Sequence, residues 1–350
     1  MRCAAAQRVS RGCALTVTIR EVADAAGVST ATVSRALSGV QTVDPELVAR
    51  VRESAESLGY RANRVARALR RQSTQTVGLV IPDITNPFFP AVVQAIEREL
   101  RHDGLSLLLC DAGNDVDVEA ELVRNLFDHQ IDGLLISACD RIASRPAVQL
   151  AASRVPVLQI DQQTVAEVPY VGVDQADAMG QIIGHLRDQG CQSFAYIGPR
   201  PEIPTARERF DAFADRVKPV DPAAANRTYL GDSSIAWGHE AANRILADGP
   251  PPDAIVCAND QAALGALQAL REHGVKVPGD VALTGFDDTV LATACEPQLT
   301  SVSQPLEELG ARAVRELSAA IGQELRQPRS VLLEASLVIR GSSRRLPPTG

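Results

Sequence analysis

The sequence predicts an α/β protein, with a small all-α head at the N-terminus followed by a larger core of two lobes built on doubly wound parallel sheets. Three observations lead to this prediction. Two short helical stretches meet at a single glycine near the start of the chain. Strand-like and helical runs alternate from about residue 76 onward, and 350 residues are too many for one ordinary domain.

Charge is unevenly divided along the chain, whose net charge is −8. Residues 17–73 carry nine arginines against six acidic residues, a net charge of +3, and residues 1–16 add a further +3. The remainder therefore carries −14. A basic head on a strongly acidic body predicts that the head binds a polyanion.

The expected compartment follows from features that the sequence lacks. No apolar run approaches the ~20 residues needed to span a bilayer. Residues 1–16 lack the apolar stretch of a secretory signal, so we expect a disordered tail or a misassigned start there. The seven cysteines are widely spaced without a C-x-x-C pair, which indicates reduced thiols and neither a disulfide framework nor a metal site. We therefore expect a cytoplasmic protein with no membrane partner, metal or cofactor.

The head begins with TIREVADAAGVSTATVSRALSG, residues 18–39, which predicts two helices and a sharp turn. Thr18 can cap the first helix, with Glu21 in capping-box position. Gly27 permits the left-handed backbone of a tight turn, and Ser29 can cap the second helix. Neither helix is long enough to be stable alone, so both must pack on a further element.

A third helix is predicted from residue 46 to about residue 58, because Asp44-Pro45 supplies a cap followed by proline at the first position. Three short helices with a glycine turn between the first two form a helix-turn-helix unit, which we place at residues 17–62. A generic helical hairpin is the alternative for this stretch alone. The candidate DNA contacts in this unit are Thr18, Ser29, Thr30, Ala31, Thr32, Ser34 and Arg35.

The next segment, YRANRVARALRRQ, predicts a short basic helix that serves as a hinge at residues 63–74. Two turns of helix are unstable in water, but the segment could order on DNA, with arginines on phosphates and Leu69 wedged into the minor groove. A solvated linker is the alternative, and both descriptions hold if the helix forms only on DNA. The candidate contacts here are Asn63, Arg64, Ala66 and Leu69.

Three motifs then occur in order, namely TIREVADAAGVSTATVSRALSG, ESLGYRANRVARALRR and VGLVIPDITNPFFPAVV. With these motifs the chain resembles the LacI/GalR family of bacterial transcription regulators, from about residue 17 to residue 340. The resemblance implies a homodimer whose two heads bind a palindromic operator in double-stranded DNA. It also implies a periplasmic-binding-protein-like core that binds a small effector.

The core is predicted to span residues 75–341. Alternation of strands and helices indicates parallel sheets, and about ten repeats are too many for one sheet. We expect a first lobe of residues 75–173 with 304–328, and a second lobe of residues 174–303 with 329–341. Residues 342–350 are expected to be a tail. Ligands bind such folds at the carboxyl ends of the strands.

Polar residues follow several predicted strands, and two phenylalanines stand beside one of them. Carboxylate, amide and guanidinium groups with an aromatic face suit a polyhydroxylated ring. For each residue alone a structural role is the commoner explanation, and Asp260 and Asp288 are left out as helix caps. The resemblance implies as effector contacts Asn86, Phe88, Phe89, Asp161, Arg207, Asn259, Asp287 and Gln304.

Two positions depart from the pattern of sugar-binding relatives. Gln162 stands where the ribose-type pattern has arginine, and Ser233 stands where an aromatic residue is frequent, with Trp237 a few residues later. We therefore expect a sugar-like ligand other than ribose. The replaced arginine also disfavours a strongly anionic ligand at that end of the cleft.

The resulting hypothesis is a repressor of a carbohydrate-utilisation operon, controlled by a sugar-like effector. A corepressed regulator that responds to a purine or another metabolite is the alternative. The C-terminal residues carry no leucine heptad, which favours a dimer over a tetramer. An enzyme is disfavoured because no G-x-G-x-x-G follows the first core strand, and a transport protein is disfavoured by the helix-turn-helix head.

Overall fold

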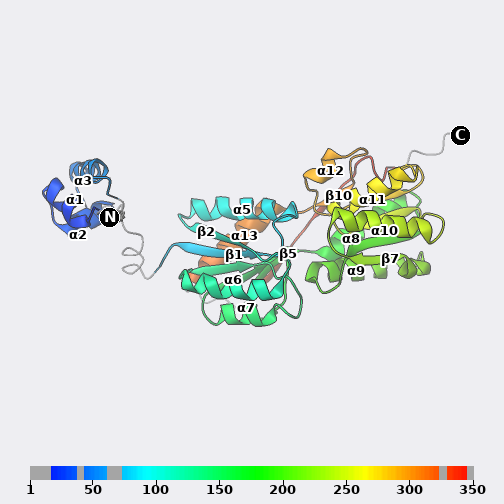
Figure 1. Cartoon of the computed structure of the whole chain (residues 1–350), viewed down its shortest axis with the longest axis horizontal. Coiled ribbons are helices and arrows are strands. Elements are labelled where there is room, and N and C mark those ends of the chain that lie inside the picture. The colour runs from blue at the N-terminus through cyan, green and yellow to red at the C-terminus, as the bar shows by residue number, and fades with distance from the viewer. Residues whose placement is uncertain (1–16, 38–42, 61–72, 323–328, 345–350) are drawn as a thin grey trace, which may run out of the picture. The chain divides into compact units, whose positions relative to one another are not determined.

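The computed structural model describes residues 17–37, 43–60, 73–322 and 329–344. It contains two compact units, Met1–Thr74 and Gln75–Gly350 (Figure 1). The predictions for the N-terminal segment, residues 1–16, lie outside the described residues. So do four candidate DNA contacts of the hinge, which are Asn63, Arg64, Ala66 and Leu69.

The head consists of the helices α1 (Ile19–Ala26), α2 (Thr30–Leu37) and α3 (Pro45–Ser57). Thr18 forms the predicted capping box with Glu21, and Gly27 ends α1 with a φ of 64°, in the left-handed region. Asp44 caps α3 and Pro45 is its first residue. The predicted helix-turn-helix arrangement is therefore confirmed.

A small apolar core holds these three helices together. Each helix is too short to be stable alone, so stability comes from packing. All the buried residues are valines or alanines, which lets the helices approach closely. They are Val22, Ala23, Ala26, Val33, Ala36, Val51 and Ala55.

The first lobe of the core is a parallel six-stranded sheet in the order β11-β5-β4-β3-β1-β2. Helices α5 (Phe88–His102) and α13 (Leu306–Ile321) cover one face, and α6 (Val116–Asp128) and α7 (Arg145–Ala152) cover the other (Figure 1). The strands are β1 (Thr76–Ile81), β2 (Ser106–Asp111), β3 (Gly133–Ile136), β4 (Val157–Ile160), β5 (Tyr170–Val173) and β11 (Ser330–Leu333).

The second lobe has a parallel four-stranded sheet in the order β7-β6-β8-β9, with apolar clusters on both faces. Its strands are β6 (Phe194–Pro199), β7 (Thr228–Gly231), β8 (Ala254–Cys257) and β9 (Ala282–Thr284). Its helices are α8 (Gln175–Asp188), α9 (Pro204–Val217), α10 (Ile235–Ala247), α11 (Asp260–Glu272) and α12 (Val290–Ala294), with a 3-10 turn at Pro222–Arg227.

The structure corrects two boundaries near the C-terminus. Residues from 329 onward were assigned to the second lobe, but β11 pairs with β5 of the first sheet, Ser330 lying opposite Tyr170. This pairing covers the otherwise open edge of β5. The chain changes lobe only afterwards, before β12 (Ser336–Val338) pairs antiparallel with β10 (Ser301–Ser303).

The predicted start of the tail at residue 342 is also wrong. Ser342 and Ser343 are fully buried. The Ser342 hydroxyl donates to the carbonyl of Leu283 at 2.6 Å and accepts from the backbone N–H of Thr300 at 2.8 Å. Ser342 belongs to the core because its hydroxyl satisfies buried backbone groups of β9 and of the residue before β10. The Ser343 hydroxyl pairs with the Thr300 hydroxyl and with His185.

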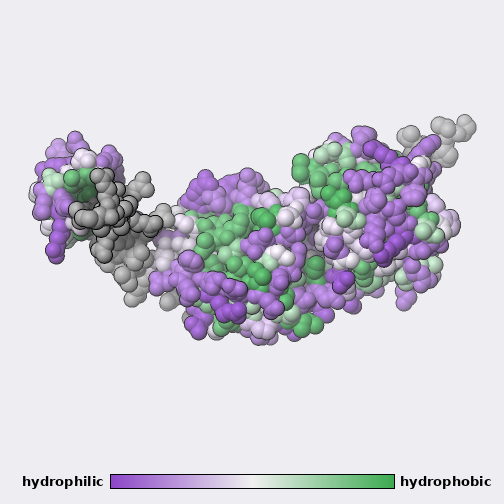
Figure 2. Space-filling view, viewed as in Figure 1, coloured by the Kyte–Doolittle hydropathy of each residue, from purple (hydrophilic) through white to green (hydrophobic). Residues whose placement is uncertain are grey.

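The surface of the first lobe carries a hydrophobic area over strand β2 (Figure 2). This strand lies at the edge of the sheet, and its Leu109 is 39% exposed. Among the described residues, no helix is both long and apolar enough to cross a bilayer.

Candidate functional site

Helix α2 presents a small, polar face to solvent. Thr30, Ala31 and Arg35 are exposed, while Val33 and Ala36 point into the head. Thr32 and Ser34 are half-buried. Small residues on the exposed face allow a helix to lie deep in a major groove, and an arginine there can reach a base edge or a phosphate.

Two predicted DNA contacts are engaged at helix ends. The Ser29 hydroxyl accepts a hydrogen bond from the backbone N–H of Thr32 at 3.1 Å and so caps α2. The backbone N–H of Thr18 donates to Glu21 at 2.6 Å, and its hydroxyl donates to the same carboxylate at 2.9 Å. These hydrogen bonds lower the pKa of Glu21. Ser29 and Thr18 therefore each stabilise the start of a helix, whether or not they also contact DNA.

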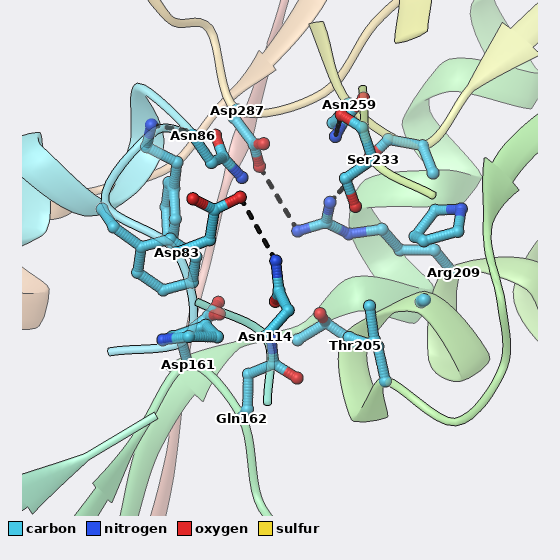
Figure 3. A pocket seen from close by; sticks show the side chains of 17 residues that line it. Asp83, Asn86, Asn114, Asp161, Gln162, Thr205, Arg209, Ser233, Asn259 and Asp287 are labelled. Atoms are coloured by element: carbon cyan, nitrogen blue, oxygen red, sulfur yellow. Dashed lines mark hydrogen bonds and ion pairs between the residues drawn. The ribbon is translucent and has the colours of Figure 1, made fainter. Parts of the chain in front are cut away.

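The core contains a pocket where strands of both sheets end (Figure 3). Its walls enclose about 540 Å³ of space, part of it open to solvent. The first lobe contributes Pro82, Asp83, Asn86, Phe88, Phe89, Asn114, Asp161 and Gln162. The second lobe contributes Pro199, Ile203, Thr205, Ala206, Arg209, Ser233, Ala258, Asn259 and Asp287.

Six of the eight predicted effector contacts line this pocket. Both phenylalanines are buried, and their rings lie edge to face, 5.2 Å apart at 74°. The two asparagines also order the backbone, since Asn86 accepts from the N–H of Phe88 and Asn259 caps α11. The six residues are Asn86, Phe88, Phe89, Asp161, Asn259 and Asp287.

Arg207 was the wrong arginine. Its side chain is 48% exposed and pairs with Asp211, at 2.6 Å between Nε and Oδ2. Arg209 lines the pocket instead. Helix α9 begins at Pro204, and residues two positions apart point to nearly opposite sides of a helix. Residues four positions apart share one face of a helix. Because Thr205 faces the pocket, Arg209 faces it too.

Arg209 is held by four groups around it. Nε donates to Gln175 Oε1 at 2.8 Å, Nη1 donates to the carbonyl of Ala258 at 2.7 Å, and Nη2 lies 3.4 Å from Asp287 Oδ1. The guanidinium also lies over the ring of Phe286, 3.6 Å from its centroid. Together these partners fix the position of the guanidinium in the pocket wall.

Gln304, the remaining predicted contact, is not among the lining residues. Its Nε2 donates to Asp287 Oδ1 at 2.7 Å, so it positions that carboxylate from behind. Trp237 does not line the pocket either, while Ser233 does. Asp260, which was left out as a cap, fixes the loop after β9 by accepting from Thr289 N–H and Ser301 Oγ, both at 2.6 Å.

Sequence reasoning left six polar lining residues out of the predicted set. Asp83, Asn114, Gln162 and Ser233 follow β1, β2, β4 and β7, so the ends of these strands were the signal for them. Asn114 Nδ2 donates to Asp83 Oδ2 at 3.2 Å. The other two are Thr205 and Arg209, on the first turns of α9.

The pocket has an excess of negative charge. Among the residues that the structure describes, Asp83, Asp161 and Asp287 line it against a single cation, Arg209. Burial raises the pKa of Asp161 to about 7, despite the opposing effect of Arg209. Burial also raises the pKa of Asp287, while Arg209 and Gln304 act in the opposite direction.

Comparison with known proteins decides the family. Residues 18–63 match the model of bacterial regulatory proteins of the lacI family, and residues 183–343 match that of the periplasmic binding protein-like domain. Over 94% of its length the chain is 32% identical to the whole of catabolite control protein A from Priestia megaterium. The chain belongs to the LacI family of bacterial regulatory proteins.

Solved structures of LacI-family regulators agree with this fold. A crystal structure of the Lac repressor dimer, bound to operator and the anti-inducer ONPF, matches with a TM-score of 0.84 and 27% identity. That match covers 94% of this chain and 99% of the other. A complex of the transcriptional regulator CelR with cellobiose matches with a TM-score of 0.70 and 29% identity, over 93% and 99% of the two chains.

Proposed function

We propose that this LacI-family protein is a homodimeric repressor of carbohydrate-utilisation genes, whose affinity for its operator is controlled by a sugar-like effector in the core pocket. The observation that carries the proposal is the pocket itself. It brings carboxylates, amides and one guanidinium together beside two phenylalanine rings. Sugar hydroxyls donate and accept hydrogen bonds, and the C–H face of a sugar ring stacks on aromatic carbon.

The relatives support both the ligand class and the binding of DNA by a dimer. CelR is solved with cellobiose, and the Lac repressor is solved as a dimer on its operator. In this chain the hydrophobic area over edge strand β2 gives a second copy an apolar surface to cover (Figure 2). We propose that two heads then bind the two halves of a palindrome, with phosphate contacts supplying affinity and α2 supplying base choice.

Control of DNA binding requires that the effector favours one arrangement of the dimer. Phosphate contacts and the hinge segment hold the repressor on DNA, and the effector shifts the population toward a form that cannot order the hinge. Reversing occupancy from 99:1 to 1:99 takes a preference of about 5.5 kcal/mol. Corepression uses the same coupling with the opposite sign.

A binding experiment with the full chain tests the proposal. An operator is selected from random duplex DNA, and its affinity is measured by fluorescence anisotropy with and without neutral sugars, sugar acids and nucleobases. Arg35→Ala should weaken operator binding by about 1–3 kcal/mol and leave the response to sugar unchanged. The matched control is Arg101→Ala, which removes an exposed arginine of the core that pairs with Glu97. An operator affinity that responds to a nucleobase alone would favour the corepressed regulator.

A further inference from the structure

The two sides of the pocket differ in what they offer a ligand. On the first-lobe side, Asp161 and Gln162 follow β4 and are 4% and 5% exposed (Figure 3). The carboxylate of Asp161 accepts no hydrogen bond from any residue that the structure describes, and the same holds for Oε1 of Gln162. Two buried acceptors therefore line the pocket without donors of their own.

An unmet acceptor in a buried site costs free energy unless a ligand supplies the donor. The carboxylate of Asp83, by contrast, already accepts from Thr85 and Asn114. Asp161 and Gln162 are adjacent in the chain, so one ligand can reach both with neighbouring groups. The pair therefore points to a ligand that carries two hydrogen-bond donors at this end.

The second-lobe side offers donors. In the described part of the chain no side chain caps the first turn of α9, where Thr205 and Ala206 line the pocket. A ligand that suits both sides must donate toward the first lobe and accept from the second. Hydroxyl groups do both, whereas a phosphate or carboxylate can only accept.

Charge acts in the same direction. Three carboxylates face the pocket against Arg209, whose guanidinium is already shared with Asp287 and the Ala258 carbonyl. An anionic ligand would add negative charge to a site where, among the described lining residues, acidic side chains already outnumber the cation. Gln162, the uncharged neighbour of Asp161, supplies no positive charge to offset it.

We propose that the pocket takes an uncharged polyhydroxylated ligand, whose hydroxyls donate to Asp161 and Gln162, and that it excludes phosphorylated and carboxylated sugars. This inference rests on the proposed sugar-sensing function. It adds the charge class of the effector, and it assigns to Gln162 the role of a specificity residue.

Matched ligands test the charge class by isothermal titration of the full chain. The pairs are glucose with glucose 6-phosphate, galactose with galacturonate, and cellobiose with cellobionate. We expect the neutral member of any pair that binds to have at least tenfold higher affinity. Galacturonamide, uncharged but close in shape to galacturonate, should bind like galactose. An anionic member that binds as tightly as its neutral partner would overturn this inference and leave sugar sensing intact. A panel without any binding ligand would overturn both.

A pair of variants tests the residue assignment. Gln162→Arg adds a cation inside the pocket and should reduce the preference for the neutral ligand at least tenfold. Gln163→Arg adds the same charge one residue later, at a side chain that does not line the pocket, and should change the preference less than twofold. If both variants changed the preference for the neutral ligand equally, Gln162 would not be a specificity residue.

Discussion

The two sides of the pocket hold their buried charges in different ways. On the second-lobe side, Arg209 and Asp287 are joined to each other and to Gln175, Gln304 and the Ala258 carbonyl. On the first-lobe side, Asp161 is just as buried but has no hydrogen-bond donor among the described residues. The first arrangement belongs to the fold, and the second costs stability until a ligand arrives.

This difference makes the two sides separable by experiment. Removing a group from the second-lobe side should destabilise the ligand-free protein, because its partners are left buried and unpaired. Removing an unmet acceptor from the first-lobe side should stabilise the ligand-free protein and weaken ligand binding. Trp237, the only tryptophan, lies in the second lobe and can report unfolding by its fluorescence.

The largest effect is expected for Arg209→Met. Methionine keeps much of the side-chain volume but leaves Asp287 buried without its cation, so we expect the free energy of unfolding to fall by about 3–5 kcal/mol. Urea titration followed by Trp237 fluorescence measures this change. The control is Arg207→Met, which breaks a half-exposed pair with Asp211 and should cost less than about 1 kcal/mol. Similar losses in the two variants would contradict the assignment of Arg209 to the buried network.

The next effect has the opposite sign. Asp161 adopts a φ of 61°, which asparagine tolerates well, so Asp161→Asn removes the charge with little backbone cost. We expect the ligand-free protein to gain about 1–2 kcal/mol, because a buried carboxylate without a donor is lost. Affinity for the neutral sugar should fall about tenfold, since hydrogen bonds to charged groups contribute about 1.5–3 kcal/mol. A loss of stability in this variant would show that Asp161 belongs to the fold after all.

The difference in stability between the wild type and Asp161→Asn should depend on pH. The pKa of Asp161 is raised to about 7 by burial, with Asp287 and Glu208 acting in the same direction and Arg209 opposing them. Between the ordinary pKa near 4 and this value, the folded state retains a proton that the unfolded state has released. The stability of the wild type relative to Asp161→Asn should therefore fall as the pH rises from about 4 to about 7, and then level off.

Urea unfolding of both proteins at several pH values measures this difference. Asp260, whose pKa burial also raises to about 7, is present in both and cancels. A difference in stability that does not change with pH would mean that Asp161 titrates normally in the folded protein.

The sequence was a good guide where a residue acts within its own segment. The capping box at Thr18, the left-handed turn at Gly27 and the Asp44-Pro45 helix start depend on neighbours a few positions away, and all three were predicted. Asn86, Asp161 and Asp287, which follow β1, β4 and β9 and line the pocket, were predicted for a related reason. Parallel strands end at one edge of a sheet, so the residues after them converge.

Prediction failed where a residue's role depended on which face of a helix it occupies, or on partners far away in the sequence. Arg207 and Arg209 are chemically alike, and only the start of α9 at Pro204 decides which one faces the pocket. The assignment of β11 depended on an open edge at β5, more than 150 residues earlier. Ser342 looked like tail because nothing local shows that its hydroxyl serves Leu283 and Thr300.

The smallest effects are expected for two glutamines, Gln162 beside Asp161 and Gln304 beside Asp287. Gln162 and Gln304 each bury an Oε1 atom that has no partner among the described residues. Gln304 also donates to Asp287, whereas Gln162 lies next to Asp161 in the pocket wall. Gln162→Met should therefore gain about 1 kcal/mol in ligand-free stability and lose affinity for the sugar by about three- to tenfold, because it removes only an unmet acceptor.

Gln304→Met removes the same acceptor together with the donor to Asp287, so the balance should reverse. We expect it to lose about 1 kcal/mol of stability, since a buried carboxylate loses one of its hydrogen bonds. The same urea titration compares the two variants. If both glutamines changed stability in the same direction, the two sides of the pocket would not differ as their contacts indicate. Opposite signs would show that a side chain whose acceptor stays unmet in the folded protein is retained for the ligand.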